Sequence, residues 1–148
     1  MIAQRLFAAG LLALGAAAVV IGTGIFLLGP AHVANLISFV LYTTGGAGDA
    51  LGAPDTDNEI RFYSVLWIAF GVIAIRAARV LPQSLGLARL LLAIFFAGGA
   101  GRALSLSSVG APHPLFVLLM WTELLASPAL LLLSLQMKSP DARKTTRH

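Results

Sequence analysis

The chain has 148 residues, of which 58% are hydrophobic and only 11% are charged, whereas a soluble domain carries about 25% charged residues. This composition indicates a membrane protein, and the absence of cysteine excludes disulfides and thiolate metal sites. The net charge of +4 comes from basic residues that flank apolar runs, a distribution that argues against nucleic-acid binding.

The first predicted membrane helix covers residues 6–28, which contain no charged side chain. A spanning helix needs about 20 apolar residues, whereas the apolar part of a signal peptide is usually about 7–15 residues long. The length of this run therefore favours an uncleaved membrane anchor over a signal peptide. Pro30 ends the predicted helix, because proline inside a helix removes a backbone hydrogen bond.

A short amphipathic helix is predicted at residues 31–42. Its apolar residues recur at i, i+3, i+4, i+7 and i+8, which is the spacing of one helix face. The run is too short to span a membrane, so we expect it to lie in the membrane interface, with a re-entrant hairpin as the alternative. Residues 43–58 are glycine-rich and acidic and predict a loop.

Three further membrane helices are predicted, at residues 59–78, 84–106 and 114–137. Residues 138–148 are polar, and we expect a disordered cytoplasmic tail there. Strand-type alternation is absent from the sequence, and open sheets cannot satisfy their backbone in lipid. The predicted fold is therefore all-α: a polytopic four-helix transmembrane bundle with one interfacial helix, forming a single domain over residues 1–137.

The basic residues set the predicted orientation. Eight of the ten lie on one side of the four-helix layout: Arg5, Arg76, Arg79, Arg89, Lys138, Arg143, Lys144 and Arg147. The other side carries the acidic residues Asp49, Asp55, Asp57 and Glu59. Because basic flanks stay on the cytoplasmic side, we expect a protein of the inner (plasma) membrane with both termini in the cytoplasm.

Four charged residues lie in the outer halves of the predicted helices: Glu59, Arg61, Arg102 and Glu123. Glu123 follows Pro114 by nine residues and so lies about 13 Å into its helix, close to the middle of a hydrocarbon core about 30 Å thick. An unpaired charge at that depth is costly. Arg102, on the preceding helix, is the predicted partner because its long side chain can reach Glu123.

Small residues surround Arg102 in its helix. Gly98 and Gly99 lie four and three residues before it on the same face, and Ala97 and Gly101 form a further small-xxx-small pair. Small side chains let a neighbouring helix approach closely. We therefore expect Gly98, Gly99 and Gly101 to be helix-packing residues beside the arginine.

Three segments of the chain together resemble one membrane family. They read NEIRFYSVLWIAFGV, FFAGGAGRALSLSSVGAPHP and WTELLASP. In this order they are similar to the small bacterial four-helix membrane proteins grouped as domain of unknown function 4345, over most of residues 5–135. The residues that match the family pattern are Glu59, Arg61, Gly101, Arg102, Gly110, Pro112 and Glu123. The resemblance implies the four-helix layout, which families similar to DoxX share, and it implies no particular activity.

The charged set suggests a small non-enzymatic protein that binds a lipid-like ligand or a partner membrane subunit through an outer-leaflet cluster. In this hypothesis Arg61 and Arg102 hold an anionic group and Glu123 fixes Arg102, with Glu59 beside them. The alternative is that the pair of Arg102 and Glu123 is a purely structural latch, an ion pair that orients the two helices and binds no ligand.

Two further hypotheses stay open. One is an enzyme acting on a lipid or isoprenoid with Glu123 as acid or base. The other is a small transporter, against which the apolar inner halves of the helices count. Metal and cofactor sites are not expected, because no two histidines have ligand spacing. Membrane lipids, a membrane-protein partner or a second copy in a homodimer are the expected partners, and nucleic acid is not.

Overall fold

The computed structural model describes residues 2–40, 42 and 48–137, and these residues contain helices and no strand. In chain order the helices are α1 (Ile2–Leu28), α2 (Pro30–Val40), α3 (Gly48–Gly52), α4 (Pro54–Arg79), α5 (Leu85–Ser108) and α6 (Pro114–Leu135). The helices α1, α4, α5 and α6 are long and apolar enough to cross a membrane. The predicted all-α class with four membrane helices is confirmed, and the chain is a multi-pass membrane protein.

The start of α4 differs most from the sequence prediction. The helix begins at Pro54 rather than at residue 59, and the short helix α3 precedes it. Proline is well suited to the first turn of a helix, and Asp55 and Asp57 are favourable near its positive end. The predicted loop is therefore wrong for residues 48–58, while residues 43–47 lie outside the described part of the chain.

The other helix ends differ by a few residues from the predicted spans. α1 begins at Ile2 instead of residue 6, α5 covers Leu85–Ser108 instead of 84–106, and α6 ends at Leu135 instead of residue 137. Hydropathy marks where a helix enters lipid, whereas backbone hydrogen bonds mark where it ends, so polar flanks extend α1 beyond its apolar run. The predicted tail at 138–148 lies outside the described residues.

The helix α2 packs through a different face from the apolar one predicted for residues 31–42. Its buried residues include Val33, Ala34 and Ser38, whereas Leu36 and Phe39 are exposed. Ser38 is accommodated on the buried face because its hydroxyl is 3.0 Å from Nε2 of His113, at the start of α6. The position of α2 in the membrane interface stays a prediction.

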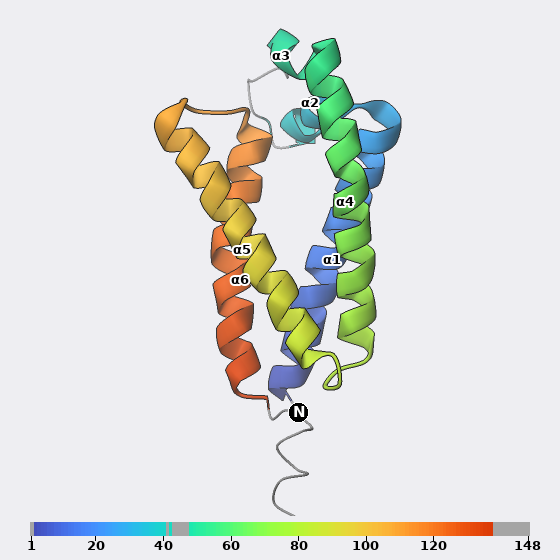
Figure 1. The fold of residues 1–148 in the computed structure, drawn as a ribbon, viewed down its shortest axis with the longest axis vertical. Coiled ribbons are helices and arrows are strands. Elements are labelled where there is room, and N and C mark those ends of the chain that lie inside the picture. The colour runs from blue at the N-terminus through green and yellow to red at the C-terminus, as the bar shows by residue number, and fades with distance from the viewer. Residues whose placement is uncertain (1, 41, 43–47, 138–148) are drawn as a thin grey trace, which may run out of the picture.

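The four long helices form two closely packed pairs, α1 with α4 and α5 with α6 (Figure 1). Glycines bring α1 and α4 together. A Cβ atom built on Gly15 would lie 2.9 Å from the carbonyl oxygen of Gly71, and one built on Gly71 would lie 2.5 Å from that of Gly15. The two backbones therefore touch directly, the arrangement that small residues permit between membrane helices.

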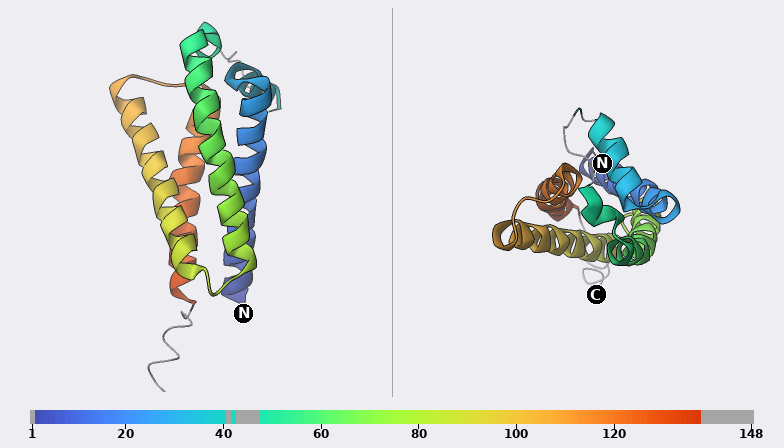
Figure 2. Two further views of the ribbon diagram at one scale, coloured as in Figure 1. Left: turned by 45° about the vertical axis from the view of Figure 1, so that its right-hand side comes forward. Right: turned by 90° about the horizontal axis from the view of Figure 1, so that it is seen from above.

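The main apolar core lies at the end of the bundle where α1 begins and α4 and α6 end (Figure 1). Its buried members are Phe7, Leu11, Ala74, Ala77, Ala78, Leu85, Ala88, Leu91 and Leu92. A smaller cluster of Ala34, Leu51 and Leu115 joins α2, α3 and α6 at the other end. From the end with the main core, α5 inclines away from α4 toward the other end of the bundle (Figure 2).

Candidate functional site

Arg102 and Glu123 form an ion pair between α5 and α6. The Nε–H of Arg102 donates to Oε2 of Glu123 at 3.0 Å and to Oε1 at 3.2 Å. Glu123 is only 3% exposed, whereas the side chain of Arg102 is 26% exposed. The structure thus brings together the two residues that we predicted to pair because of their depth in the membrane.

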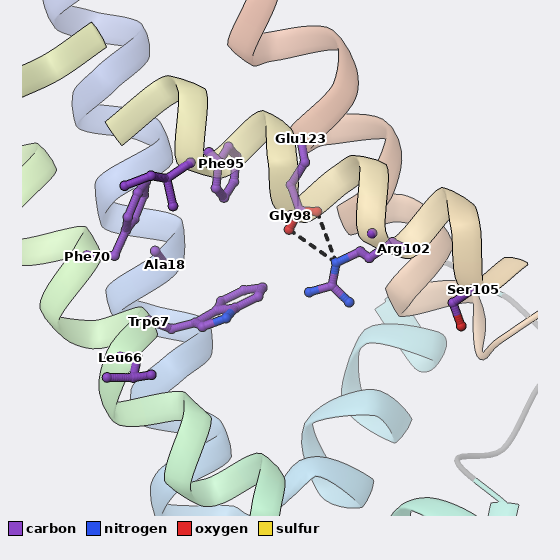
Figure 3. A pocket seen from close by; sticks show the side chains of 11 residues that line it. Ala18, Leu66, Trp67, Phe70, Phe95, Gly98, Arg102, Ser105 and Glu123 are labelled. Carbon is purple, nitrogen blue, oxygen red and sulfur yellow. Dashed lines mark hydrogen bonds and ion pairs between the residues drawn. The ribbon is translucent and has the colours of Figure 1, made fainter. Parts of the chain in front are cut away.

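Gly99 explains how the carboxylate reaches this position. A Cβ atom on Gly99 would lie 2.8 Å from the Cβ of Glu123 and 3.0 Å from the Cγ of Leu124, so only glycine lets α6 approach α5 so closely here. Among the described residues, a Cβ atom on Gly98 would meet only Oε2 of Glu123, at 3.8 Å. Glu123 therefore emerges from the helix contact beside Gly98 and turns toward Arg102 (Figure 3).

Two aromatic rings hold the guanidinium of Arg102. Its Cζ lies 5.5 Å from the ring centroid of Trp67, on α4, and 5.6 Å from that of Phe116, on α6. Both distances are within the range of cation–π attraction. The side chain therefore bridges the space between the two helix pairs, and its Nη atoms point toward that space and toward Trp67 (Figure 3).

A cavity of about 500 Å³ adjoins the ion pair and is lined by all four long helices. Most of its wall is hydrocarbon, including Ala18, Phe70 and Phe95, whereas Arg102, Glu123 and Ser105 supply polar atoms (Figure 3). The rings of Phe70 and Phe95 stack across α4 and α5 with centroids 5.4 Å apart. Leu66 and Ile94, also in the wall, are each 55% exposed, so this cavity opens on the outer surface between α4 and α5.

A second cavity, of about 360 Å³, lies between α4 and α6 and also touches Arg102. Its wall includes Ile60, Tyr63, Phe116 and Leu119 and is again mostly apolar. Both volumes fall in the usual range for small-molecule sites, about 300–1,000 Å³. A guanidinium at the edge of such cavities is suited to carboxylate or phosphate groups, which it binds through paired donors.

The family comparison agrees with this architecture. Residues 6–134 match the family described as Domain of unknown function (DUF4345). The chain belongs to this family. The resemblance identified from the sequence is thereby confirmed, and the matched range contains Trp67, Arg102 and Glu123. Comparisons with curated proteins and with solved structures find no match.

In this DUF4345 chain, Arg61 is engaged away from Arg102. Its Nε donates to Oδ2 of Asp57 at 2.6 Å, and its Nη1 donates to the carbonyl oxygen of Phe26 at 2.7 Å. Gly29, with a φ of +88°, makes room for this contact, since a Cβ atom there would lie 2.6 Å from Nη2 of Arg61. Arg61 thus joins α4 to the end of α1.

Glu59 is exposed, and among the described residues neither Glu59 nor Arg61 lines the two cavities beside Arg102. The four predicted residues therefore do not form one cluster. The physical reason is local: Asp57 lies one helical turn before Arg61, and an acid at that spacing is the natural partner of the arginine.

The three predicted packing glycines also have different environments in this DUF4345 structure. Gly99 packs against α6 as expected. Gly98 and Gly101 line the larger cavity instead, and a Cβ atom on Gly101 would meet nothing within 4 Å among the described residues. Both lie on the side of α5 that faces the larger cavity, where Gly98 is next to the carboxylate of Glu123 and not to a helix backbone of the described residues.

The sequence reasoning missed the aromatic residues around Arg102. A signal for part of this set was present, because Tyr63, Trp67 and Phe70 recur at i, i+4 and i+7 and thus share one face of α4. All three line one or both cavities. The contribution of Phe116 has no such signal, because it depends on how α6 lies beside α5.

Proposed function

We propose that this protein binds an amphiphile whose anionic group is held by Arg102 and whose apolar part lies in the larger cavity. The observation that carries the proposal is the direction of the guanidinium: Nε is used by Glu123, while the Nη atoms face an apolar cavity of about 500 Å³. A charged group placed beside hydrocarbon needs a polar partner, and an anionic amphiphile supplies one.

Glu123 has a supporting role in this proposal. Its two carboxylate oxygens accept from the same Nε–H, which fixes the plane of the guanidinium. Trp67 and Phe116 restrain the group further through their ring faces. The arginine is therefore oriented before a ligand arrives, which lowers the entropy lost on binding.

Native mass spectrometry with lipid analysis of the purified full chain tests the proposal. We expect one anionic amphiphile to be enriched over the bulk lipid in the wild-type protein and to be lost in Arg102→Gln. Arg76→Gln is the matched control, because it removes the same charge from an exposed position on another helix, α4. A lipid profile like the bulk membrane, or enrichment that survives in Arg102→Gln, would overturn the proposal and leave a structural latch.

A second variant keeps the test valid if Arg102→Gln folds poorly. Gly101→Leu retains the ion pair and adds a side chain to the cavity wall, at a position where a Cβ atom meets nothing within 4 Å among the described residues. We expect Gly101→Leu to weaken binding without loss of the folded protein. Unchanged binding in a folded Gly101→Leu protein would contradict the assignment of the cavity.

The proposal places the protein in the bacterial inner membrane with both termini in the cytoplasm and Arg102 in the outer half of the bundle. The support is the distribution of charge, with Arg5, Arg76 and Arg79 at one end and Asp55 and Asp57 at the other. Because the chain has no cysteine, a single cysteine introduced on either side of the membrane can be labelled selectively and reports the orientation. A membrane-impermeant maleimide should label Asn58→Cys in intact spheroplasts and Gln83→Cys only after lysis, and the reverse pattern would refute the orientation.

A further inference from the structure

The two cavities meet at a shared wall. Leu66, Trp67 and Arg102 belong to the lining of both, with the larger cavity on the side of Phe95 and the smaller on the side of Phe116. The guanidinium therefore lies between two apolar spaces rather than at the closed end of one. This position limits the kind of amphiphile that can satisfy the whole site.

An amphiphile with one chain would use this site incompletely. Its anionic group would bind Arg102 and its chain would fill one cavity, while the other, also of ligand size, would keep no apolar occupant. The wall of the smaller cavity is mostly apolar, and the hydroxyl of Ser64 in that wall already donates to the carbonyl oxygen of Arg61 at 2.6 Å. Both cavities thus favour hydrocarbon.

Both cavities can receive a chain from the surrounding lipid. Leu66, in the shared wall, is 55% exposed, and Tyr63, in the wall of the smaller cavity, is 53% exposed. Leu66 shares the wall of the larger cavity with Ile94 of α5, which is also 55% exposed. A lipid could therefore enter sideways, with its chains parting around Trp67.

We propose that the ligand is an anionic lipid with two apolar chains, held with its acidic group at Arg102 and one chain in each cavity. The inference rests on the proposed function and makes it more specific. It excludes fatty acids and other single-chain amphiphiles as the preferred ligands.

Three probes that share their chemistry test the wild-type full chain in detergent. Dioleoyl phosphatidic acid carries the phosphate and two chains, oleoyl lysophosphatidic acid carries the same phosphate with one chain, and dioleoylglycerol carries two chains without charge. We expect the first to bind at least about tenfold more tightly than either of the others. The one-chain lipid loses the burial of several methylenes, and burying only a few accounts for about that factor. Dioleoylglycerol loses the charge-assisted hydrogen bonds to Arg102. Dissociation constants come from native mass spectrometry titrations.

The outcomes separate this inference from the proposed function. If the two phosphate lipids bind equally and both need Arg102, the proposed function stands and the two-chain inference is wrong. If neither binds in a way that depends on Arg102, the proposed function itself fails. If dioleoylglycerol equals dioleoyl phosphatidic acid, the anionic group is not recognised and both proposals fall.

Filling one cavity at a time gives an independent test. Leu119→Trp narrows the smaller cavity, whose wall contains Leu119, and leaves the wall of the larger one unchanged. We expect it to bring the affinity for dioleoyl phosphatidic acid down to that of the one-chain lipid, which itself changes less than about twofold. Ile60→Phe is the milder replacement if the tryptophan variant folds poorly. Equal losses for both lipids, or no loss for either, would contradict the assignment of one chain to each cavity.

Discussion

Removal of Arg102 should destabilise the protein through Glu123. In Arg102→Ala a carboxylate that is 3% exposed loses the Nε–H that binds both of its oxygens. Breaking a buried ion pair from one side costs about 3–5 kcal/mol, and the lost contacts with two aromatic rings add about 1 kcal/mol. Because the side chain of Arg102 is 26% exposed, we expect a total near the lower end of this sum, about 4 kcal/mol.

The double-mutant cycle isolates the pair. Glu123→Ala should cost less, about 2 kcal/mol, because Arg102 keeps its aromatic contacts and its partial exposure. The double variant has no unpaired buried charge, so we expect its loss to be smaller than the sum of the single losses by about 2 kcal/mol.

The assay is unfolding of the full chain in mixed micelles titrated with sodium dodecyl sulfate, followed by far-ultraviolet circular dichroism. The free energies of unfolding of the wild type, both single variants and the double variant close the cycle. Arg76→Ala, an exposed arginine on α4, controls for the loss of positive charge. Single losses that add to within about 0.5 kcal/mol would refute the coupling and with it the reasoning from burial.

Three further predictions concern the packing of the helices. Gly71→Ala should lower the free energy of unfolding by about 1–3 kcal/mol, because its Cβ atom would lie 2.5 Å from the carbonyl oxygen of Gly15. Gly86→Ala is the control: its Cβ atom would meet nothing within 4 Å among the described residues, so it should be neutral or stabilising in the same assay. Arg89→Ala should lower the free energy of unfolding by about 1.5–3 kcal/mol, because the guanidinium donates to the hydroxyl and the carbonyl of Ser134 at 3.0 and 2.8 Å. Arg89→Lys should restore only part of this loss, because lysine lacks the planar guanidinium whose two N–H groups make both bonds. Arg61→Ala should destabilise more than Asp57→Asn, because only the former also loses the carbonyl of Phe26, and unfolding curves in which the order is reversed would contradict that contact.

The fold was predictable because lipid leaves the backbone few choices. A chain with apolar runs of this length must satisfy its peptide groups within helices, so composition and run length alone lead to the bundle. The start of α4 was not predicted, because its first turn carries Asp55 and Asp57 and its low hydropathy is typical of a loop. The preference of proline for the first turn of a helix, here at Pro54, predicts this start better than hydropathy does.

The Arg102–Glu123 pair was predictable from a single physical requirement, that a carboxylate deep in a membrane helix needs a partner. The aromatic surroundings of Arg102 were not, because they depend on how far α5 inclines from α4 and how α1 packs on α4. That packing is set by backbone contact at Gly15 and Gly71, which leaves no trace in the hydropathy pattern. Arg61 was misplaced for the converse reason, since its partner Asp57 had been assigned to a loop.

The core around Phe7 and Leu92 is the region where the two helix pairs are joined. The two helices of each pair pack closely against each other, and residues of both pairs meet in this core at one end of the bundle (Figure 1). A small rotation of one pair against the other about this point would change the room beside Arg102 and would leave both pair interfaces intact. The volume of the site then depends on the angle between the two helix pairs. For the lipid ligand that we propose, such a rotation predicts weak discrimination among chain lengths.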